Sequence, residues 1–127
     1  MKYFICPIYR ISLGIPAEQT LRIITLNRNQ TSIFENDNED TFISLPVLLK
    51  QKDTTSPHGI VLKSEKPGKT VLMVPRVEID LEIPEENIQR LPEVFSDFFR
   101  YFKGIYFNGD NSILILNPEK LMEACND

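Results

Sequence analysis

Apolar and polar residues alternate most regularly between Val77 and Ile83. Apolar side chains occupy every second position there, and acidic side chains occupy the positions between them. A period of two is typical of a β-strand that buries one face and exposes the other. The pattern therefore predicts a strand over this segment.

A β-hairpin is predicted near the C-terminus. Tyr101 to Phe107 is rich in aromatic and aliphatic residues, which suit a half-buried strand. Asn108 and Gly109 both adopt positive φ at low cost, so we expect a turn there. Ile113 to Leu116 is uniformly apolar, so we expect it to be covered on both faces or to lie inside a small closed barrel, with Leu114 buried.

A short helix is predicted directly after this hairpin. Asn117 is a suitable N-cap, because its side chain can accept hydrogen bonds from the first free amides of a helix. Pro118 suits the first helical position, and Glu119 places a negative charge in the first turn.

The other strands are predicted from shorter apolar runs between turn-forming residues. We expect them at Tyr3 to Ile8, Ile11 to Ile15, Thr20 to Leu26, Thr41 to Leu45, His58 to Ser64 and Lys69 to Val74. A tight turn at Tyr9 and Arg10 joins the first two, and Pro7 indicates an edge or bulged strand. Short helical turns are expected at Pro16 to Gln19, Pro46 to Lys50 and Val94 to Phe99.

A polar stretch interrupts the chain from Asn27 to Asp40. Its asparagines and its acidic run from Glu35 onward predict a solvated loop. The run is distantly similar to a calcium-binding loop but lacks the glycine and the closing glutamate at the required offsets. We therefore expect no calcium site here.

The predicted elements amount to about nine short strands and two or three short helices, which favours a small barrel or a sandwich over βαβ units. The chain has 127 residues, of which 42% are hydrophobic and 25% charged. This length suits one domain, or two small lobes that share a core.

Charge and targeting signals narrow the choice of partners. The net charge is −4 and no stretch concentrates lysine or arginine, so we expect no nucleic-acid partner. The apolar run at the N-terminus is too short for a signal peptide, and no segment has the roughly 18 apolar residues of a membrane span. Cys6 and Cys125 lie far apart, and we expect no disulfide between them. We expect a cytoplasmic protein with no membrane insertion.

A search for catalytic chemistry finds no recognisable constellation. The single histidine, His58, has no nucleophile at a characteristic spacing, and a structural role is favoured. No phosphate-binding loop, nucleophile elbow or metal-ligand spacing occurs. Glu85 and Glu86 are adjacent carboxylates that point apart in a connector. Aromatic residues between Phe95 and Phe102 are expected to pack in a core rather than to floor a ligand pocket. We therefore expect no catalytic residues, no cofactor and no metal, and the remaining hypothesis is a protein-binding surface.

Three ordered blocks of sequence resemble the CheW family of chemotaxis adaptors. The first, Ile15 to Ile24, is similar to the family's I-P-I-E-Q-V-R-E-I-L passage. The second, Val71 to Ile88, is similar to L-V-D-x-V followed by I-P-E-E-x-I. The third, Tyr101 to Leu121, is similar to Y-x-x-G-V, then G, then L-L-L-D-x-E-K-L. The likeness covers nearly the whole chain in the family's order.

Several polar positions of the family pattern have changed. Arg22 stands where the family has an acidic residue, Pro75 and Asn117 each replace an aspartate, and the family's N-L-R-G hairpin has no counterpart between Asn27 and Asp40. The apolar positions are retained, which indicates a kept fold with a rewritten binding surface.

The resemblance implies a mostly-β CheW-like fold spanning residues 1–127, with two small five-stranded SH3-like barrel lobes, a shared hydrophobic seam and a short C-terminal helix. It also implies a non-enzymatic adaptor whose protein partners are a CheA-like histidine kinase and the cytoplasmic tip of a chemoreceptor. The protein-contacting residues that it implies are Gln19, Thr20, Arg22, Ile24 and Gly104.

Two other hypotheses stay open. Arg22 and the missing N-L-R-G segment favour a divergent CheW-like paralogue that regulates a different protein. A small-ligand-binding or enzymatic domain built on the aromatic cluster is the third, and it requires a deep pocket lined with polar groups.

Overall fold

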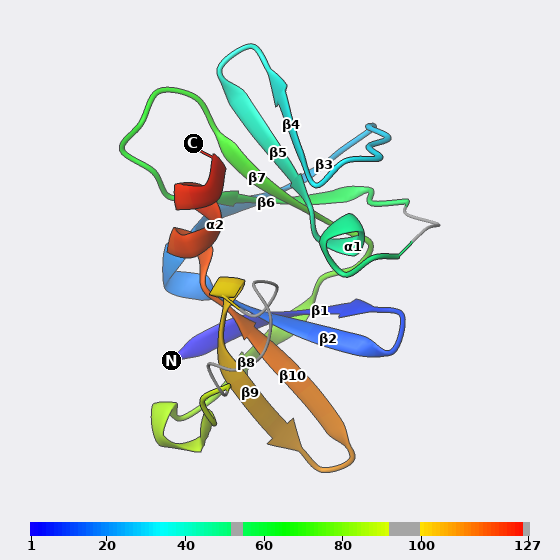
Figure 1. The fold of residues 1–127 in the computed structure, drawn as a ribbon. Coiled ribbons are helices and arrows are strands. Elements are labelled where there is room, and N and C mark those ends of the chain that lie inside the picture. Colours follow the sequence, from blue (N-terminus) through cyan, green and yellow to red (C-terminus); the bar gives the residue numbers. More distant parts are fainter. Residues whose placement is uncertain (52–54, 92–99, 126–127) are drawn as a thin grey trace. The chain divides into compact units, whose positions relative to one another are not determined.

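The computed structural model describes residues 1–51, 55–91 and 100–125, and the chain divides into two compact units (Figure 1). Unit 1 comprises residues 1–18 and 78–127, and unit 2 comprises residues 19–77. Each unit contains one five-stranded sheet. The predicted mostly-β fold, with two five-stranded lobes and a short C-terminal helix, is confirmed. The hydrophobic seam between the lobes stays a prediction.

The sheet of unit 1 is built from both ends of the chain. Its order is β8 (Glu78–Glu82), β1 (Lys2–Ile8), β2 (Ile11–Pro16), β10 (Asn111–Leu116) and β9 (Phe102–Asn108). β1 and β2 form an antiparallel hairpin, as do β9 and β10. β10 lies parallel to β2, with Ile113 beside Ser12, so residues about a hundred positions apart are neighbours. The alternating segment that predicted a strand forms β8.

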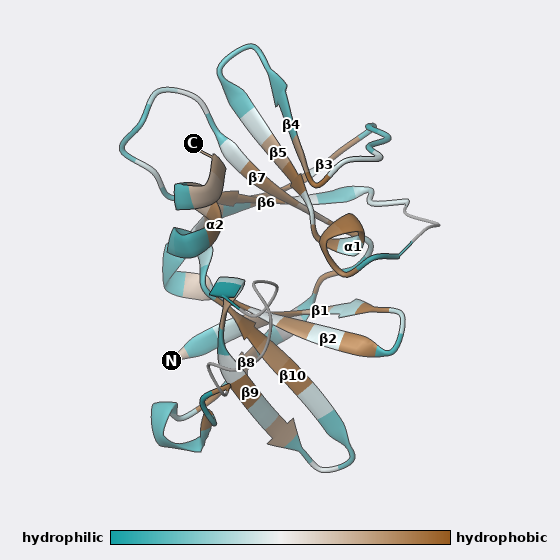
Figure 2. Ribbon diagram, in the orientation of Figure 1, coloured by the Kyte–Doolittle hydropathy of each residue, from teal (hydrophilic) through white to brown (hydrophobic). Residues whose placement is uncertain are grey.

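Apolar side chains from β1, from β10 and from the residue that follows β8 form the core of this sheet. The buried cluster consists of Tyr3, Ile5, Ile83, Ile113 and Ile115. These residues lie at alternate positions of their strands, which explains why the period-two pattern located the core face. Figure 2 shows the same strands as brown bands between teal turns.

The connection after β8 crosses to the opposite edge of the same sheet. It forms the short 3₁₀ turn η2 (Glu85–Asn87) and then pairs with β9. The amide of Gln89 donates to the Ile105 carbonyl at 2.9 Å, and the amide of Ile105 donates back at 2.8 Å. Gly104 allows this approach, because a Cβ atom there would overlap the backbone carbonyl of Gln89.

The C-terminal helix α2 (Pro118–Cys125) begins as the sequence predicts. The Asn117 side-chain oxygen accepts a hydrogen bond from the Lys120 amide at 3.4 Å, and Pro118 is the first helical residue. Leu121 is fully buried and Glu119 is exposed.

The sheet of unit 2 comes from one continuous segment. Its order is β3 (Thr20–Thr25), β6 (His58–Leu62), β7 (Thr70–Val74), β5 (Asp40–Ser44) and β4 (Phe34–Asp37). The predicted hairpin of β6 and β7 is antiparallel, whereas β5 lies parallel to β7. The 3₁₀ turn η1 (Ala17–Gln19), which was also predicted, precedes β3.

A one-turn helix, α1 (Leu45–Leu48), follows β5. The Ser44 hydroxyl accepts a hydrogen bond from the Val47 amide at 3.3 Å, and Pro46 lies in the first turn, as expected for a helix start. Lys50 ends the helix at φ 61°, and its amide donates to the Val47 carbonyl at 2.9 Å.

The solvated loop predicted for Asn27 to Asp40 is wrong in its second half, which forms β4 and the start of β5. Gln30 is only 4% exposed, and its Nε2 lies 2.9–3.0 Å from the carbonyl oxygens of Ser32, Ile33 and Phe42. The buried Gln30 amide group, rather than a row of alternating apolar side chains, holds this segment in place. Hydrophobic periodicity therefore gives no signal for the strand.

Arg28 adds to this arrangement. Its guanidinium lies over the Phe42 ring, 4.2 Å from the centroid, and its nitrogens lie 3.5 and 3.6 Å from carboxylate oxygens of Glu35 and Asp37. The carboxylates of Glu35 and Asp37 on β4 are thereby paired with one cation, Arg28. These contacts fix the polar segment to the rest of unit 2.

Three smaller expectations are corrected. The turn between β9 and β10 was expected at Asn108 and Gly109, but it occupies Gly109 and Asp110, because Asn108 still pairs with Asn111. Gly109 has positive φ as expected, 65°. Leu114 is half-buried rather than buried. Of the two alternatives expected from Pro7, the edge strand is wrong, since β1 pairs with both β2 and β8, whereas the bulge agrees with a register shift between Tyr3 and Ile5 in the pairing with β8. The predicted helix at Val94 to Phe99 lies outside the described residues.

Candidate protein-binding surface

The most exposed apolar strand of unit 2 is β3. Among the strands that the structure describes, it pairs with β6 and has no neighbour on its other side. Leu21 is 60% exposed and Ile23 is 41% exposed. Large aliphatic side chains on an open strand edge are costly to leave in water, so they mark a surface that another polypeptide can cover.

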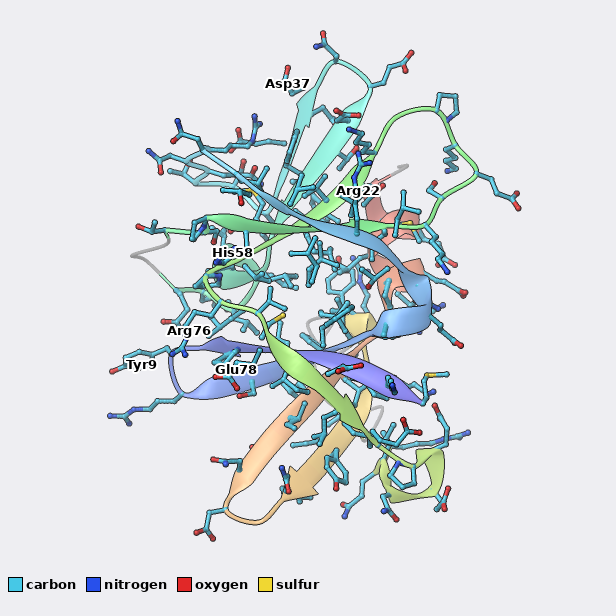
Figure 3. The ribbon with its side chains drawn as sticks, turned by 180° about the vertical axis from the view of Figure 1, so that it is seen from behind. Tyr9, Arg22, Asp37, His58, Arg76 and Glu78 are labelled. Carbon is cyan, nitrogen blue, oxygen red and sulfur yellow. The ribbon has the colours of Figure 1, made fainter. Side chains whose placement is uncertain are left out.

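A bulge sets the orientation of these side chains. Thr20 lies opposite Leu62 and Arg22 lies opposite Val61, so Leu21 has no residue of β6 directly across from it. The additional residue bends the strand and turns Leu21 outward. Arg22 is also exposed, and Figure 3 shows its side chain extending away from β3. The strand therefore presents two aliphatic groups with a cation between them.

The other sheet edges in the described part of the chain are protected. The outer positions of β8 carry exposed carboxylates, and β4 is a four-residue strand that ends in two exposed polar residues. The free side of β9 is partly covered by Gln89. Charge, short length and cover are the usual protections of a sheet edge against unwanted pairing. β3 has a bulge and one charge, Arg22, but it also exposes the aliphatic side chains of Leu21 and Ile23.

Four of the five predicted contact residues belong to this region. Gln19 precedes β3, and its backbone carbonyl accepts a hydrogen bond from the Lys63 amide at 2.9 Å, whereas its buried Oε1 has no hydrogen-bond partner among the described residues. Thr20 is partly buried, and Arg22 is exposed. Ile24 is half-buried and lies against Gly59 of β6, since a Cβ atom on that glycine would be 3.2 Å from Ile24 Cγ1. Ile24 therefore contributes mainly to packing.

The fifth predicted residue, Gly104, lies in unit 1. It is buried and packs against the backbone of Gln89, so its position is explained by steric fit within that unit. Leu21 and Ile23 were not among the predicted contact residues. The available signal was their place in a strand with three apolar residues out of six, but periodicity alone does not reveal a bulge.

One member of the adjacent acidic pair Glu85 and Glu86 has a structural role. Glu85 Oε2 lies 2.6 Å from Lys103 Nζ, and the buried Tyr3 hydroxyl donates to Glu85 Oε1 at 3.2 Å. The hydrogen bond from Lys103 lowers the pKa of Glu85 below its usual value. Burial, followed by the nearby Glu85 charge, raises the pKa of Tyr3 to about 12. Glu86 is exposed, so the two carboxylates do not form an acid–base pair.

No metal-binding constellation is found in the described residues, since no three His, Cys, Asp or Glu side chains gather there. His58 is half-buried at the start of β6 (Figure 3). Cys6 and Cys125 are free thiols, and burial raises the pKa of Cys6 to about 12. Burial also raises the pKa of Cys125 to about 11. Both thiols are therefore neutral near pH 7.

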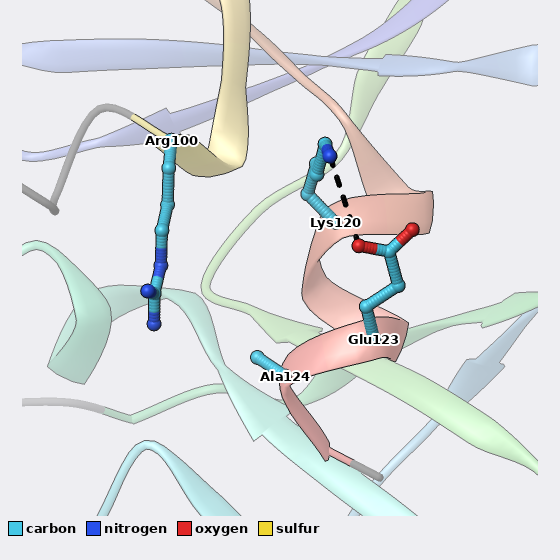
Figure 4. Close-up of a pocket in the computed structure, with 4 residues that line it drawn as sticks. All are labelled: Arg100, Lys120, Glu123 and Ala124. Atoms are coloured by element: carbon cyan, nitrogen blue, oxygen red, sulfur yellow. Dashed lines mark ion pairs between the residues drawn. The ribbon is translucent and has the colours of Figure 1, made fainter. Parts of the chain in front are cut away.

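A small pocket lies beside α2 in unit 1. It is lined by Arg100, Lys120, Glu123 and Ala124, and it encloses about 220 Å³ (Figure 4). Lys120 Nζ and Glu123 Oε2 form an ion pair at 3.7 Å across part of its wall. Its volume is below the range of roughly 300–1,000 Å³ typical of small-molecule sites. Tyr101 and Phe102 are buried and are not among the lining residues.

The chain has the CheW-like fold. This fold has two five-stranded sheets, and its unit 1 is assembled from both chain ends and carries a short C-terminal helix. Among solved structures, the chain is similar to the scaffolding protein TtCheW from Thermoanaerobacter tengcongensis, with a TM-score of 0.73 and 16% sequence identity. The match covers 91% of this chain and 83% of that chain. No protein-family model matches the sequence, and the search of curated proteins returns no match. The structural likeness therefore establishes the fold.

The helices of the described residues are short or polar. None of them combines the length and the apolar character needed to cross a bilayer.

Proposed function

We propose that this protein is a non-enzymatic CheW-like adaptor that couples chemoreceptors to a CheA-type histidine kinase in the cytoplasm, with residues 1–127 acting as a single CheW-like domain. The fold supports this function, because the similar solved structure is a scaffolding protein. The observation that carries the proposal is the open edge of β3, where Leu21 and Ile23 are exposed on either side of Arg22.

Strand β3 suits recognition of another polypeptide for two physical reasons. Covering its aliphatic side chains removes apolar area from water, which supplies most of the affinity of such contacts. The Arg22 guanidinium offers a planar set of donors to a carboxylate of the partner, which supplies orientation. The predicted contact residues Gln19, Thr20 and Ile24 hold this strand in position beside β6.

The proposal is tested by measuring binding of the purified chain to a CheA-type kinase and to a receptor cytoplasmic fragment encoded in the same genome. We expect both complexes to form, and Ile23→Lys to weaken at least one of them by about tenfold, because a charge replaces an apolar contact. Lys66→Glu, an exposed change in the turn between β6 and β7, is the matched control and is expected to bind like the wild type. Absence of both complexes would refute the adaptor function.

A second candidate function is a divergent paralogue that binds a different protein. Arg22 supports it, because the charge is opposite to that of the family at this position, and so does the lack of an N-L-R-G sequence between Asn27 and Asp40. Arg22→Glu separates the two candidates. Tighter binding to kinase or receptor would indicate a modified version of the family surface, whereas unchanged binding would favour the paralogue.

A further inference from the structure

The turn between β9 and β10 uses only one residue of the Asn-Gly pair that predicted it. Asn108 is the last residue of β9 and pairs with Asn111, whereas Gly109 and Asp110 form the turn itself (Figure 1). Gly109 has φ 65°, a conformation that glycine adopts at low cost. The turn therefore explains the glycine and does not require an asparagine at position 108.

An asparagine that precedes glycine also has a chemical property. The backbone nitrogen of the second residue can attack the side-chain carboxamide carbon of the first and close a cyclic imide. Glycine favours this reaction, because it has no Cβ atom to obstruct the approach and its backbone rotates freely. The reaction requires an exposed asparagine, a backbone nitrogen that no hydrogen bond holds, and room for the chain to move.

Asn108 and Gly109 meet these three requirements. Both residues are exposed. The Gly109 amide lies outside the paired part of the hairpin and donates no backbone hydrogen bond within the described ranges of the chain. An added Cβ atom on Gly109 would have no atom within 4 Å other than those of its chain neighbours, so the turn has open space around it.

The other asparagines of the described chain are placed less favourably. Each of them precedes a residue that carries a side chain. Asn87 precedes Ile88, whose amide donates to the Glu85 carbonyl at 3.1 Å and is therefore held in place. Asn117 precedes Pro118, which has no amide hydrogen to lose.

We infer that Asn108 is a site of spontaneous covalent modification, at which the Gly109 nitrogen attacks the side chain and releases ammonia. The bond from Gly109 N to Asn108 Cγ forms, and the bond from Cγ to the side-chain nitrogen breaks. That nitrogen leaves as ammonia and takes the amide proton of Gly109. Water then opens the cyclic imide at one of its two carbonyl groups. Opening on the main-chain side of the ring gives isoaspartate, and opening on the other side gives aspartate.

Either product changes the end of this hairpin. A carboxylate appears beside the exposed Asp110 and adds one negative charge to a chain whose net charge is −4. Isoaspartate also adds a carbon atom to the main chain, so the pairing of residue 108 with Asn111 cannot keep its register. The modification needs only this chain and water, so it does not depend on the proposed adaptor function.

The experiment incubates the purified wild-type chain in neutral buffer and follows Asn108 by peptide mapping and mass spectrometry. A synthetic peptide of residues 105–112, incubated in parallel, sets the time scale. We expect the folded protein to gain about 1 Da at Asn108, as a mixture of aspartate and isoaspartate. We expect its rate to lie within about tenfold of the peptide's rate, because the site is open without unfolding. Conversion of the peptide without conversion of the folded protein would overturn the inference.

Two variants test which atom attacks. Gly109→Ala is expected to slow the reaction by about tenfold or more, because a Cβ atom hinders the approach and restricts the backbone. Asn108→Gln keeps a neutral carboxamide but would have to close a larger ring, so we expect it to stay unmodified over the same period. Gly109→Ala reacting as fast as the wild type, or aspartate forming without isoaspartate, would contradict attack by the Gly109 nitrogen.

Two further comparisons complete the test. Asn87 is the internal control, and it is expected to stay unmodified in the samples in which Asn108 reacts. Asn108→Asp carries the new charge without the added main-chain carbon. We expect the isoaspartate form to lose amide-exchange protection at Asn111 by about tenfold relative to Asn108→Asp, because the end of the hairpin opens more often. Equal protection in the two forms would show that the altered main chain leaves the pairing intact, contrary to the change inferred for the hairpin.

Discussion

Gly104 shows how one small residue permits a long-range connection. Gln89 and Ile105 exchange two backbone hydrogen bonds across the outer side of β9. A side chain at position 104 would occupy the space of the Gln89 carbonyl group and would also lie 2.8 Å from Ile88 Cγ2. Steric fit within unit 1 accounts for a glycine at this position, and the contact role that the resemblance implies for Gly104 stays a prediction.

Gly104→Ala is therefore expected to destabilise the protein by about 1–3 kcal/mol, because backbone atoms must move to accommodate the methyl group. Urea denaturation followed by circular dichroism measures the change. Gly109→Ala separates steric from conformational effects: its Cβ would meet open space, but φ is 65°, so we expect a loss of about 1 kcal/mol or less from conformation alone. Equal and small losses for both variants would contradict the steric explanation.

Glu85 provides a prediction about pH. The Lys103 hydrogen bond lowers its pKa in the folded protein below the ordinary value of 4.5. A carboxyl group whose folded pKa is depressed stabilises the protein at pH above its unfolded pKa, and this contribution is lost as the pH falls through the folded pKa. We expect the urea midpoint of the wild type to fall more between pH 7 and pH 3 than that of Glu85→Gln.

Salt is the control for this prediction. The Glu85 and Lys103 side chains are both partly exposed, so high ionic strength screens their interaction. In molar salt the two proteins are expected to show nearly the same dependence on pH. A difference that persists in salt would show that the hydrogen bond from the Tyr3 hydroxyl, rather than the ion pair, is responsible.

At the scale of single elements, the burial of strand β10 differs at one residue from what its sequence predicts. Three of the four residues from Ile113 to Leu116 are buried, but Leu114 is half-buried. The core of unit 1 accepts Ile113 and Ile115 on one face, while the opposite face near the β9–β10 turn is only partly covered. Uniform hydrophobicity therefore identified the strand correctly and overstated the burial of one side chain.

Neighbouring substitutions test this difference. Ile115→Ala removes a fully buried side chain and is expected to cost about 2–5 kcal/mol. Leu114→Ala is expected to cost about 1–2 kcal/mol, because part of its apolar surface is already in contact with water. Chemical denaturation of the two variants measures the difference. A loss for Leu114→Ala as large as that for Ile115→Ala would show that both faces of β10 are covered.

The sequence predicts most elements because their patterns are local. Alternation located β8, turn residues located the hairpin of β6 and β7, and cap residues located α2. The β4–β5 hairpin was missed because its stabilising contacts come from Gln30 and Arg28, which are polar. Exposure of Leu21 was missed because a bulge changes which face a residue occupies without changing the composition of the strand.

At the scale of the whole molecule, the parallel pairings decide the topology. β2 with β10 in unit 1, and β5 with β7 in unit 2, each join strands that no tight turn connects. Hydrophobic periodicity contains no information about such distant pairings. The ordered likeness to the CheW family supplied the architecture instead, and the structural match to a scaffolding protein confirmed it at the level of the fold.

This topology predicts an asymmetric response to truncation. All five strands of the unit 2 sheet lie between residues 19 and 77, whereas unit 1 needs β9 and β10 beside β2. A chain that ends at Arg100 is expected to lose amide-exchange protection in β1 and β2, because β2 loses its neighbour and the core cluster loses Ile113 and Ile115. Amides of β6 and β7 are expected to stay protected, since both of their neighbouring strands are present. Hydrogen exchange followed by mass spectrometry measures both regions, and retained protection in β1 and β2 would show that the N-terminal hairpin does not depend on the parallel pairing.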